Sequence, residues 1–268
     1  MATLTRMAHD HAHGHAHDVR ERRFAEGDRE AWEREVDPRE LYEPGRRDIY
    51  NFIDETKIRH LRPLLPASGS AVEIGAGSGR LLIRAGLERP YRLVALDYAA
   101  YAMRAASENA RRAGRTVARV LGDARRLPFP DASFDLVLSG GLLEHFRDPA
   151  PVLREMARIL SPRGLFYADI VPRKVSLYRW AERDRMQRAE HMAEGIYESD
   201  LPKGAWARLI RDSGLADVRV ISAGVYPPYT FRGYDRLAWK YADLVRALDG
   251  TAVADVLGWF YMATARKP

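Results

Sequence analysis

Three alternating glycines stand where an apolar run passes into a helical pattern. Residues 71–80 read Ala-Val-Glu-Ile-Gly-Ala-Gly-Ser-Gly-Arg, and the apolar Leu81, Leu82 and Ile83 follow. Glycine suits a sharp turn that a ligand approaches closely, because it has no Cβ and tolerates positive φ. A helix that begins after such a turn presents unpaired N–H groups and the positive end of its dipole. The pattern therefore predicts a site for an anionic group at residues 75–79.

Acidic residues follow the next two apolar runs. Asp97 lies about 20 residues beyond the glycines, where a carboxylate can hold a ribose diol, and Asp123 ends the run after that. A dinucleotide fingerprint reads G-x-G-x-x-G, whereas the sixth position counted from Gly75 is Arg80. The spacing G-x-G-x-G therefore departs from the dinucleotide fingerprint.

Seven short apolar runs, separated by helical stretches, surround these residues. They are Ala71–Ile74, Arg92–Leu96, Ala118–Leu121, Phe134–Leu138, Leu165–Val171, Val218–Ser222 and Phe260–Ala265. Such runs are typical of strands buried on both faces, and their alternation with helices indicates parallel pairing. We therefore predict an α/β fold: a doubly wound, Rossmann-like, seven-stranded and mostly parallel sheet with helices on both faces and helical lid insertions. A helix over Arg46–Leu61 precedes the first strand.

Composition narrows the class of protein. The 268 residues are 46% hydrophobic and 30% charged, as expected for one catalytic domain with appendages. The absence of cysteine excludes disulfides, thiolate zinc sites, iron–sulfur clusters and cysteine nucleophiles. The net charge is +6 without a dense Lys/Arg block, so neither nucleic acid nor membrane is expected as a partner. Because no secretory signal or long apolar run occurs, we expect a cytoplasmic protein.

The chain divides into three parts. Residues 1–19 form a His-rich flexible tail, with His9, His11, His13, His15 and His17 at a period of two. This tail is either plain solvated chain or an adventitious binder of divalent transition metals. Residues 20–45 are expected to form a helical N-terminal lid, and residues 46–268 the catalytic domain. Insertions at about 172–203 and 226–258 build either the substrate site or plain packing helices.

The order of these motifs resembles class I S-adenosylmethionine (SAM)-dependent methyltransferases, particularly the small-molecule group related to the ubiquinone and menaquinone biosynthesis enzymes. The resemblance covers roughly residues 46–171 and includes Leu127-Pro128-Phe129-Pro130-Asp131-Ala132-Ser133-Phe134-Asp135 and Leu142-Leu143-Glu144-His145-Phe146. It implies SAM as cofactor and S-adenosylhomocysteine (SAH) as product. Beyond residue 171 the resemblance is architectural only.

The resemblance implies roles for residues at four strand ends. The methionine end of SAM would be held by Glu73 and the backbone of Gly75, Ala76, Gly77 and Gly79, with Ser139 and Gly140 lining it. Asp97 would hold the ribose hydroxyls, and Tyr98 would pack near the adenine. Asp123 and the backbone of Ala124 would bind the adenine edge, although Asp123 could instead cap its loop.

Chemistry beyond the cofactor rests on fewer residues. An acceptor hydroxyl needs a base, and His145, in the Glu-His-Phe triplet, either is that base or encloses SAM. Candidate acceptor contacts are Asp169, which could equally cap a turn, and Tyr178, Trp180, His191 and Tyr229 from the insertions. The acidic ligand set of the metal-dependent catechol branch has no match here, so we predict no catalytic metal.

The expected function is methyl transfer to an O, N or C nucleophile of a small, aromatic or apolar metabolite in biosynthesis. Alternatives are an RNA or protein methyltransferase, or a SAM-binding protein without turnover. The sequence leaves monomer and homodimer open.

Overall fold

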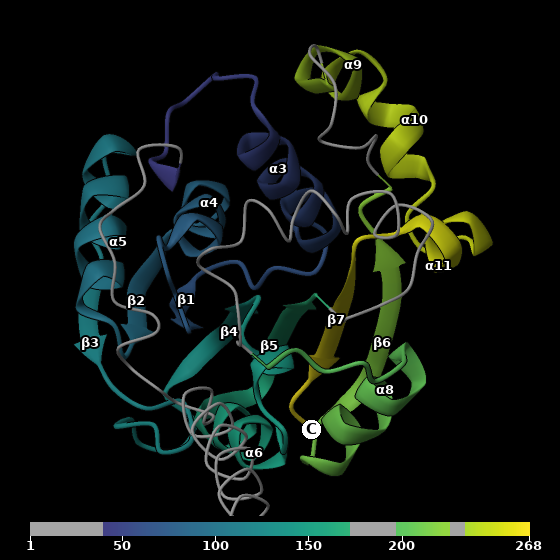
Figure 1. Cartoon of the computed structure of the whole chain (residues 1–268). Coiled ribbons are helices and arrows are strands. Elements are labelled where there is room, and N and C mark those ends of the chain that lie inside the picture. The colour runs from purple at the N-terminus through teal and green to yellow at the C-terminus, as the bar shows by residue number, and fades with distance from the viewer. Residues whose placement is uncertain (1–39, 172–196, 226–233) are drawn as a thin grey trace, which may run out of the picture.

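The computed structural model describes residues 40–171, 197–225 and 234–268. These residues form a seven-stranded sheet whose strands alternate with helices along the chain (Figure 1). The strands are β1 (Gly69–Ile74), β2 (Tyr91–Asp97), β3 (Ala118–Leu121), β4 (Phe134–Gly140), β5 (Leu160–Ile170), β6 (Ala216–Ala223) and β7 (Phe260–Arg266). Each one overlaps an apolar run predicted as a strand, which confirms the predicted α/β fold.

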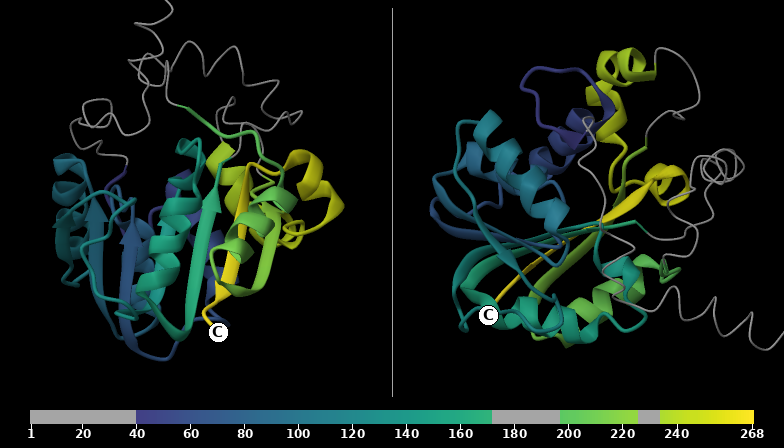
Figure 2. Two further views of the ribbon diagram at one scale, coloured as in Figure 1. Left: turned by 90° about the horizontal axis from the view of Figure 1, so that it is seen from below. Right: turned by 60° about the vertical axis from the view of Figure 1, so that its left-hand side comes forward.

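The order of the strands creates a crevice at the middle of the sheet. The order is β3-β2-β1-β4-β5-β7-β6, and all pairings are parallel except those of β7, which runs antiparallel to β5 and β6. Viewed from the side in Figure 2, the parallel strands point towards one edge. From β1 the chain continues outwards through β2 to β3, and it then returns to form β4 on the other side of β1. The carboxyl ends of β1 and β4 therefore flank the place where such sheets bind ligands.

Helices cover both faces of the sheet (Figures 1 and 2). One face carries α3 (Ile49–Leu61), α4 (Arg80–Glu88) and α5 (Ala100–Arg112), and the other carries α6 (Ala150–Ile159) and α8 (Lys203–Asp212). Three short helices, α9 (Tyr234–Lys240), α10 (Ala242–Ala247) and α11 (Ala252–Leu257), precede β7. Across the described ranges, no helix has the length and apolar character that a membrane span requires.

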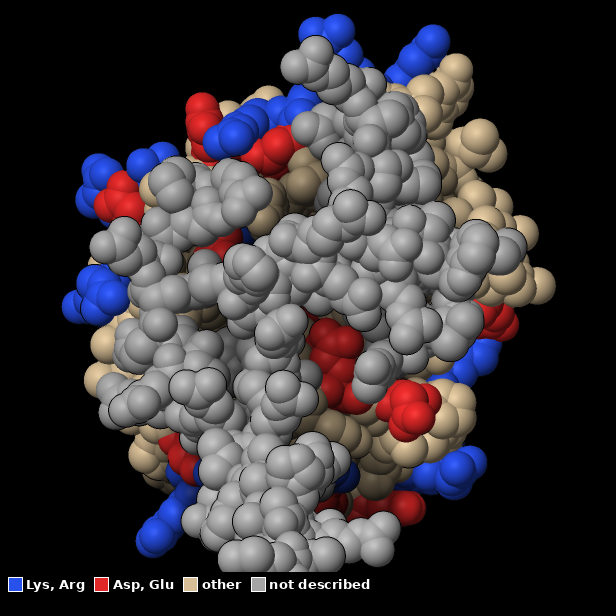
Figure 3. All heavy atoms as spheres, viewed as in Figure 1, with Lys and Arg blue, Asp and Glu red and all other residues tan. Residues whose placement is uncertain are grey.

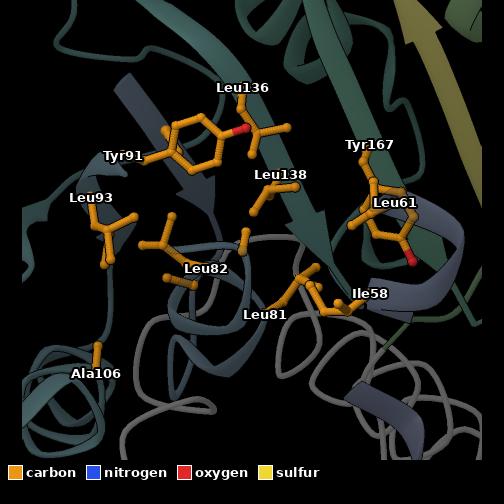
Figure 4. Packing of buried hydrophobic residues seen from close by; sticks show 14 of the residues in the cluster. Ile58, Leu61, Leu81, Leu82, Tyr91, Leu93, Ala106, Leu136, Leu138 and Tyr167 are labelled. Carbon is orange, nitrogen blue, oxygen red and sulfur yellow. The ribbon is translucent and has the colours of Figure 1, made fainter. Parts of the chain in front are cut away.

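Two apolar clusters lie on the two sides of the sheet. Leu136 and Leu138 of β4 belong to the first, together with Leu82 of α4 and Leu93 of β2 (Figure 4). The second contains Trp206 of α8, which is fully buried. Because successive strand residues point to opposite faces, the central strands read as continuous apolar runs rather than alternating ones.

The structure differs from the sequence-based prediction at two places. First, β5 begins at Leu160 instead of Leu165, because Ser-Pro-Arg-Gly at 161–164 reads as a turn but joins the strand through a register shift. Arg163 there has φ of +64° and donates its N–H to Lys267 at 2.9 Å. Second, residues 41–48 are turns, bends or irregular chain, so α3 begins at Ile49 rather than at Arg46.

Candidate functional site

The glycine turn joins β1 to α4 at the crevice. Gly75, Gly77 and Gly79 all have positive φ, between +49° and +67°. At Gly75 an added Cβ would also lie 2.8 Å from the side chain of Leu142, so this position excludes larger residues twice over. Gly79 is the N-cap of α4 in the left-handed conformation. The turn therefore brings the helix N-terminus to the carboxyl end of β1, as an anionic ligand group requires.

Asp97, at the end of β2, is held against this turn. Its Oδ2 accepts the N–H of Gly77 at 2.9 Å, and its Oδ1 accepts the N–H of Ala99 at 3.0 Å. These bonds fix the carboxylate between the glycine turn and the start of α5, with the residue 9% exposed. A carboxylate in this position can accept hydrogen bonds from the hydroxyls of a ribose.

The predicted adenine end is more open. Asp123 accepts the N–H of Arg125 at 2.9 Å and forms an ion pair with its guanidinium at 2.7 Å. This ion pair lowers the pKa of Asp123. The side chain thus caps its loop in this structure, and adenine binding would require Arg125 to move. Ala124 is buried, whereas Tyr98 is half-buried.

Glu73 is a buried carboxyl without an ion-pair partner among the described residues. Its Oε2 accepts the N–H of Leu82, in the first turn of α4, at 3.2 Å. Burial raises the pKa of Glu73 to about 8, although that hydrogen bond and the charge of Lys57 oppose the rise. A bound cation beside Glu73 would favour its ionised form, because an opposite charge stabilises a buried carboxylate.

Buried polar atoms gather at the carboxyl ends of β4 and β5. Ser139 Oγ, Glu144 Oε2 and Asp169 Oδ1 have no hydrogen-bond partner within the described part of the chain. Burial also raises the pKa of Glu144 to about 8. Unsatisfied buried groups are uncommon in folded proteins, and so many at one strand edge indicate that a polar ligand completes the site. A ligand with donors and positive charge, as SAM has in its sulfonium and ammonium groups, fits these residues.

Asp169 lies in an ion pair that the sequence did not predict. It is 3% exposed, and Lys57 of α3 donates to its Oδ2 at 2.8 Å. Burial works against charge on Lys57, but the carboxylate of Asp169 outweighs it and raises the pKa of Lys57. Neither of the two roles predicted for Asp169, an acceptor contact or a turn cap, included this ion pair, because no sequence signal indicates that Lys57 lies beside a residue 112 positions away.

His145 ends the short 3-10 helix η2 (Leu143–His145), which follows β4. Its Nδ1 lies 2.9 Å from the backbone oxygen of Tyr197, and because a carbonyl only accepts, Nδ1 carries the proton. Burial lowers the pKa of His145, although hydrogen bonds to the backbone of Tyr197 and Gly141 oppose the shift. The ring is therefore neutral near pH 7, with Nε2 as its basic nitrogen. The N–H of Ser199 also donates to the backbone oxygen of Glu144 at 2.8 Å, so residues 197–199 are held against η2.

Two further residues, to which the sequence analysis assigned no role, connect residues 40–42 to the glycine turn. Asn109 of α5 is fully buried. Its side-chain amide donates to the backbone oxygens of Ser78 at 2.8 Å and Glu40 at 3.1 Å. Its side-chain oxygen accepts the N–H of Tyr42 at 2.6 Å. Arg80, directly after the glycines, donates to Asp54 of α3 at 2.8 Å. The Arg80 guanidinium lies 5.8 Å from the Tyr42 ring centroid. Two buried polar side chains, one on α4 and one on α5, therefore hold the glycine turn in place.

Several predicted residues lie outside the described ranges: Tyr178, Trp180, His191 and Tyr229, and with them the His-rich tail. The described ranges contain no cluster of three His, Cys, Asp or Glu residues suited to a metal ion. In Figure 3, the visible Lys and Arg side chains lie mostly around the rim of the face viewed, and Asp and Glu side chains lie both among them and nearer the middle.

Comparison with known proteins places the chain in a family. Residues 72–168 match the model of a methyltransferase domain. The chain is 30% identical over 183 residues to a demethylmenaquinone methyltransferase of Roseiflexus castenholzii, which covers 62% of this chain and 76% of that protein. It is 27% identical over 208 residues to a ubiquinone biosynthesis O-methyltransferase of Stutzerimonas stutzeri, covering 74% of this chain and 83% of that one.

A solved structure shares the fold. It is described as a SAM-dependent methyltransferase, possibly a histamine N-methyltransferase, from Thermotoga maritima. The TM-score is 0.56 at 22% identity, with 82% of this chain and 91% of that chain covered. Together with the glycine turn and the acidic residues at the ends of β1 and β2, these similarities assign both fold and cofactor. The chain belongs to the class I methyltransferases and is an enzyme that uses S-adenosylmethionine.

Proposed function

We propose that the enzyme methylates an O, N or C nucleophile of a small aromatic or apolar metabolite. The observation that carries this proposal is the crevice between β1 and β4, where buried polar atoms lack partners beside the glycine turn. The names of the two relatives, which concern quinone biosynthesis, support a small planar acceptor. The aromatic residues of both insertions suit the same kind of acceptor.

We propose the following cofactor contacts. Glu73 and the backbone of residues 75–79 bind the methionine end, and Ser139 and Gly140 line it. Asp97 binds the ribose hydroxyls, and Tyr98 packs near the adenine. Asp123, once released from Arg125, and the backbone of Ala124 bind the adenine edge.

The chain's contribution to catalysis is chiefly alignment. SAM supplies an activated methyl group on a cationic sulfur, so the protein has to orient the acceptor in line and exclude water. Oriented proximity alone can contribute roughly 7–11 kcal/mol to lowering the barrier. For a hydroxyl acceptor, Nε2 of the neutral His145 can take the proton. For an acceptor that is already nucleophilic, His145 acts only by holding residues 197–199 over the site.

Calorimetric titration tests the cofactor site directly. Protein truncated before Val19 is titrated with SAM, SAH and, as control, NAD. Micromolar binding of SAM and SAH alone is expected, and no binding or a preference for NAD would contradict the proposal. SAH formation in the presence of phenolic and amine acceptors then identifies the acceptor class.

The same assays separate the alternatives. A SAM-binding protein without turnover would bind SAH but form none with any acceptor. An RNA methyltransferase would be retained on heparin in a salt-sensitive manner and would form SAH with tRNA or rRNA.

A further inference from the structure

A cleft lies between the end of α3 and the sheet face that carries this helix. Its volume is about 250 Å³. Three strands form its floor: Thr264 of β7 pairs with Tyr167 of β5 and with Arg219 of β6, and all three residues line the cleft. His60 and Leu64 border it from the side of α3. None of the described residues proposed to hold SAM lines this cleft, so it is separate from the SAM site.

Part of the cleft is apolar. Leu165 of β5 and Met262 of β7 line it with 1% and 3% of their surface exposed, and Ile221 of β6 adds a half-buried side chain. A dry cavity of about 150 Å³ holds a benzene molecule, so this larger cleft has room for one or two fused rings. A ring bound here would remove apolar surface of both ligand and protein from water.

The cleft is lined by more positive than negative charge. Arg219 has no hydrogen bond or ion pair within the described ranges. Arg266 donates to the backbone oxygens of Leu64 at 2.8 Å and Arg163 at 3.2 Å, and no described carboxylate pairs with it. Asp217 is the one carboxylate among the described residues that line the cleft. Two guanidinium groups and a single carboxylate leave one positive charge in excess, which favours a ligand with one negative charge.

Polar contacts hold the walls of the cleft in place. His60 Nε2 lies 3.1 Å from Oδ2 of Asp249, whose side chain is 1% exposed. The other oxygen of Asp249 accepts the N–H of Gly224 at 2.9 Å. On the opposite wall, the bond from Arg266 to the Leu64 carbonyl joins β7 to the chain that follows α3. The cleft is thus already formed without a ligand, and binding has little of the protein to order.

We propose that this cleft binds a small organic monoanion, namely a carboxylate carried on a body of one or two rings. The carboxylate pairs with Arg219, and the rings lie against Leu165 and Met262. A guanidinium group suits a carboxylate because it presents two parallel N–H donors. A cationic ligand would meet two guanidinium groups, and a neutral ligand would leave the excess charge without a partner. The proposal goes beyond the methyl transfer proposed above and does not depend on it.

The experiment compares two probes of the same ring system on matched variants of the full chain. One probe is 2-naphthoate, and the other is the neutral 2-naphthylmethanol. Dissociation constants are measured by calorimetry for the wild type, Arg219→Gln and Asp217→Asn. Both side chains are exposed, and asparagine tolerates the φ of +52° at position 217. Arg59→Gln is the control, because it removes a positive charge from α3 outside the cleft.

The wild type is expected to bind 2-naphthoate about 5- to 10-fold more tightly than the alcohol. Arg219→Gln should reduce this preference to less than about twofold, Asp217→Asn should increase it, and Arg59→Gln should leave it unchanged. The opposite signs of the two cleft variants would assign the effect to charge rather than to altered folding. Equal binding of the two probes, no binding of 2-naphthoate, or an unchanged preference in Arg219→Gln would refute the proposal.

Methyl NMR spectra locate the bound probe. The methyl resonance of Met262, which lines the cleft, should shift on titration with 2-naphthoate. That of Met156, which is fully buried in the cluster on the other side of the sheet, should not. Saturating SAH should leave the affinity for 2-naphthoate unchanged. Displacement of 2-naphthoate by SAH, or a Met262 resonance that does not move, would show that the probe binds elsewhere and that the proposal is wrong.

Discussion

Replacing Glu73 by glutamine should stabilise the ligand-free protein at alkaline pH. The carboxyl is buried, and its pKa rises from 4.5 to about 8. A carboxyl that holds its proton more tightly in the folded state stabilises that state below pH 4.5, and this contribution is lost as the pH rises towards 8. Glutamine is neutral at every pH and can still accept the N–H of Leu82 through its amide oxygen.

The magnitude follows from the size of the pKa rise. At about 1.4 kcal/mol per pKa unit, the rise corresponds to about 5 kcal/mol of coupling between proton binding and folding, of which about 3 kcal/mol is lost between pH 5 and pH 8. The unfolding free energy of the wild type should therefore fall by about 3 kcal/mol more than that of Glu73→Gln over this interval. Glu144 titrates in both proteins and cancels in the difference.

Urea denaturation followed by tryptophan fluorescence at several pH values measures this difference. Glu108→Gln is the control of opposite sign, because Arg111 and Arg112 lower the pKa of this exposed carboxyl to about 2. Its stabilisation is present above the unfolded pKa and is lost on acidification. Parallel pH profiles for wild type and Glu73→Gln would show that Glu73 is ionised in the folded protein, and the reasoning would be wrong. A variant that gains stability should also bind SAM more weakly, since the missing charge belongs to the ligand site.

Four further outcomes are expected. Asp97→Ala should weaken SAM binding at least tenfold by calorimetry, and an unchanged dissociation constant would refute the ribose placement. Trp206→Ala should lower the unfolding free energy by about 3–5 kcal/mol in urea, whereas Trp206→Phe should cost clearly less because the indole N–H has no described partner. Asn109→Ala should speed hydrogen exchange at the Tyr42 amide severalfold, and unchanged exchange would show that this bond does not hold the segment. His145→Asn keeps a donor for the Tyr197 carbonyl but cannot act as a base. If His145 is the base, kcat should fall about 10²–10⁴-fold in this variant while the KM for SAM stays unchanged. If Asn retains the wild-type kcat and Ala does not, the role of His145 is limited to holding residues 197–199.

The strands could be predicted because each central one is buried on both faces and reads as an uninterrupted apolar run. The start of β5 could not, since its first five residues include Pro162 and Gly164 and owe their pairing to Lys267, more than 100 positions away. The glycine turn was visible because its backbone demands a particular residue type. The Lys57–Asp169 pair was not, because an ion pair between distant elements leaves no local pattern in the sequence.

The same principle separates the predicted site residues. Asp97 lies at the end of β2 beside the glycine turn, and this location could be inferred from its spacing along the sequence. The alternatives for Asp123 depended on a neighbour, Arg125, whose side chain could have pointed elsewhere. Asn109 looks like an ordinary polar helix residue until the fold brings Glu40 and Ser78 to it.

The position of β7 has a consequence for synthesis on the ribosome. This strand lies between β5 and β6, yet it is the last of the seven to be made. Until residues 260–266 leave the exit tunnel, β5 has an open edge and β6 has no partner in the sheet. Open edges of this kind pair readily with other chains, so the nascent protein is exposed to aggregation until β7 emerges. The SAM crevice, formed by the first four strands, can assemble well before that vulnerable interval closes.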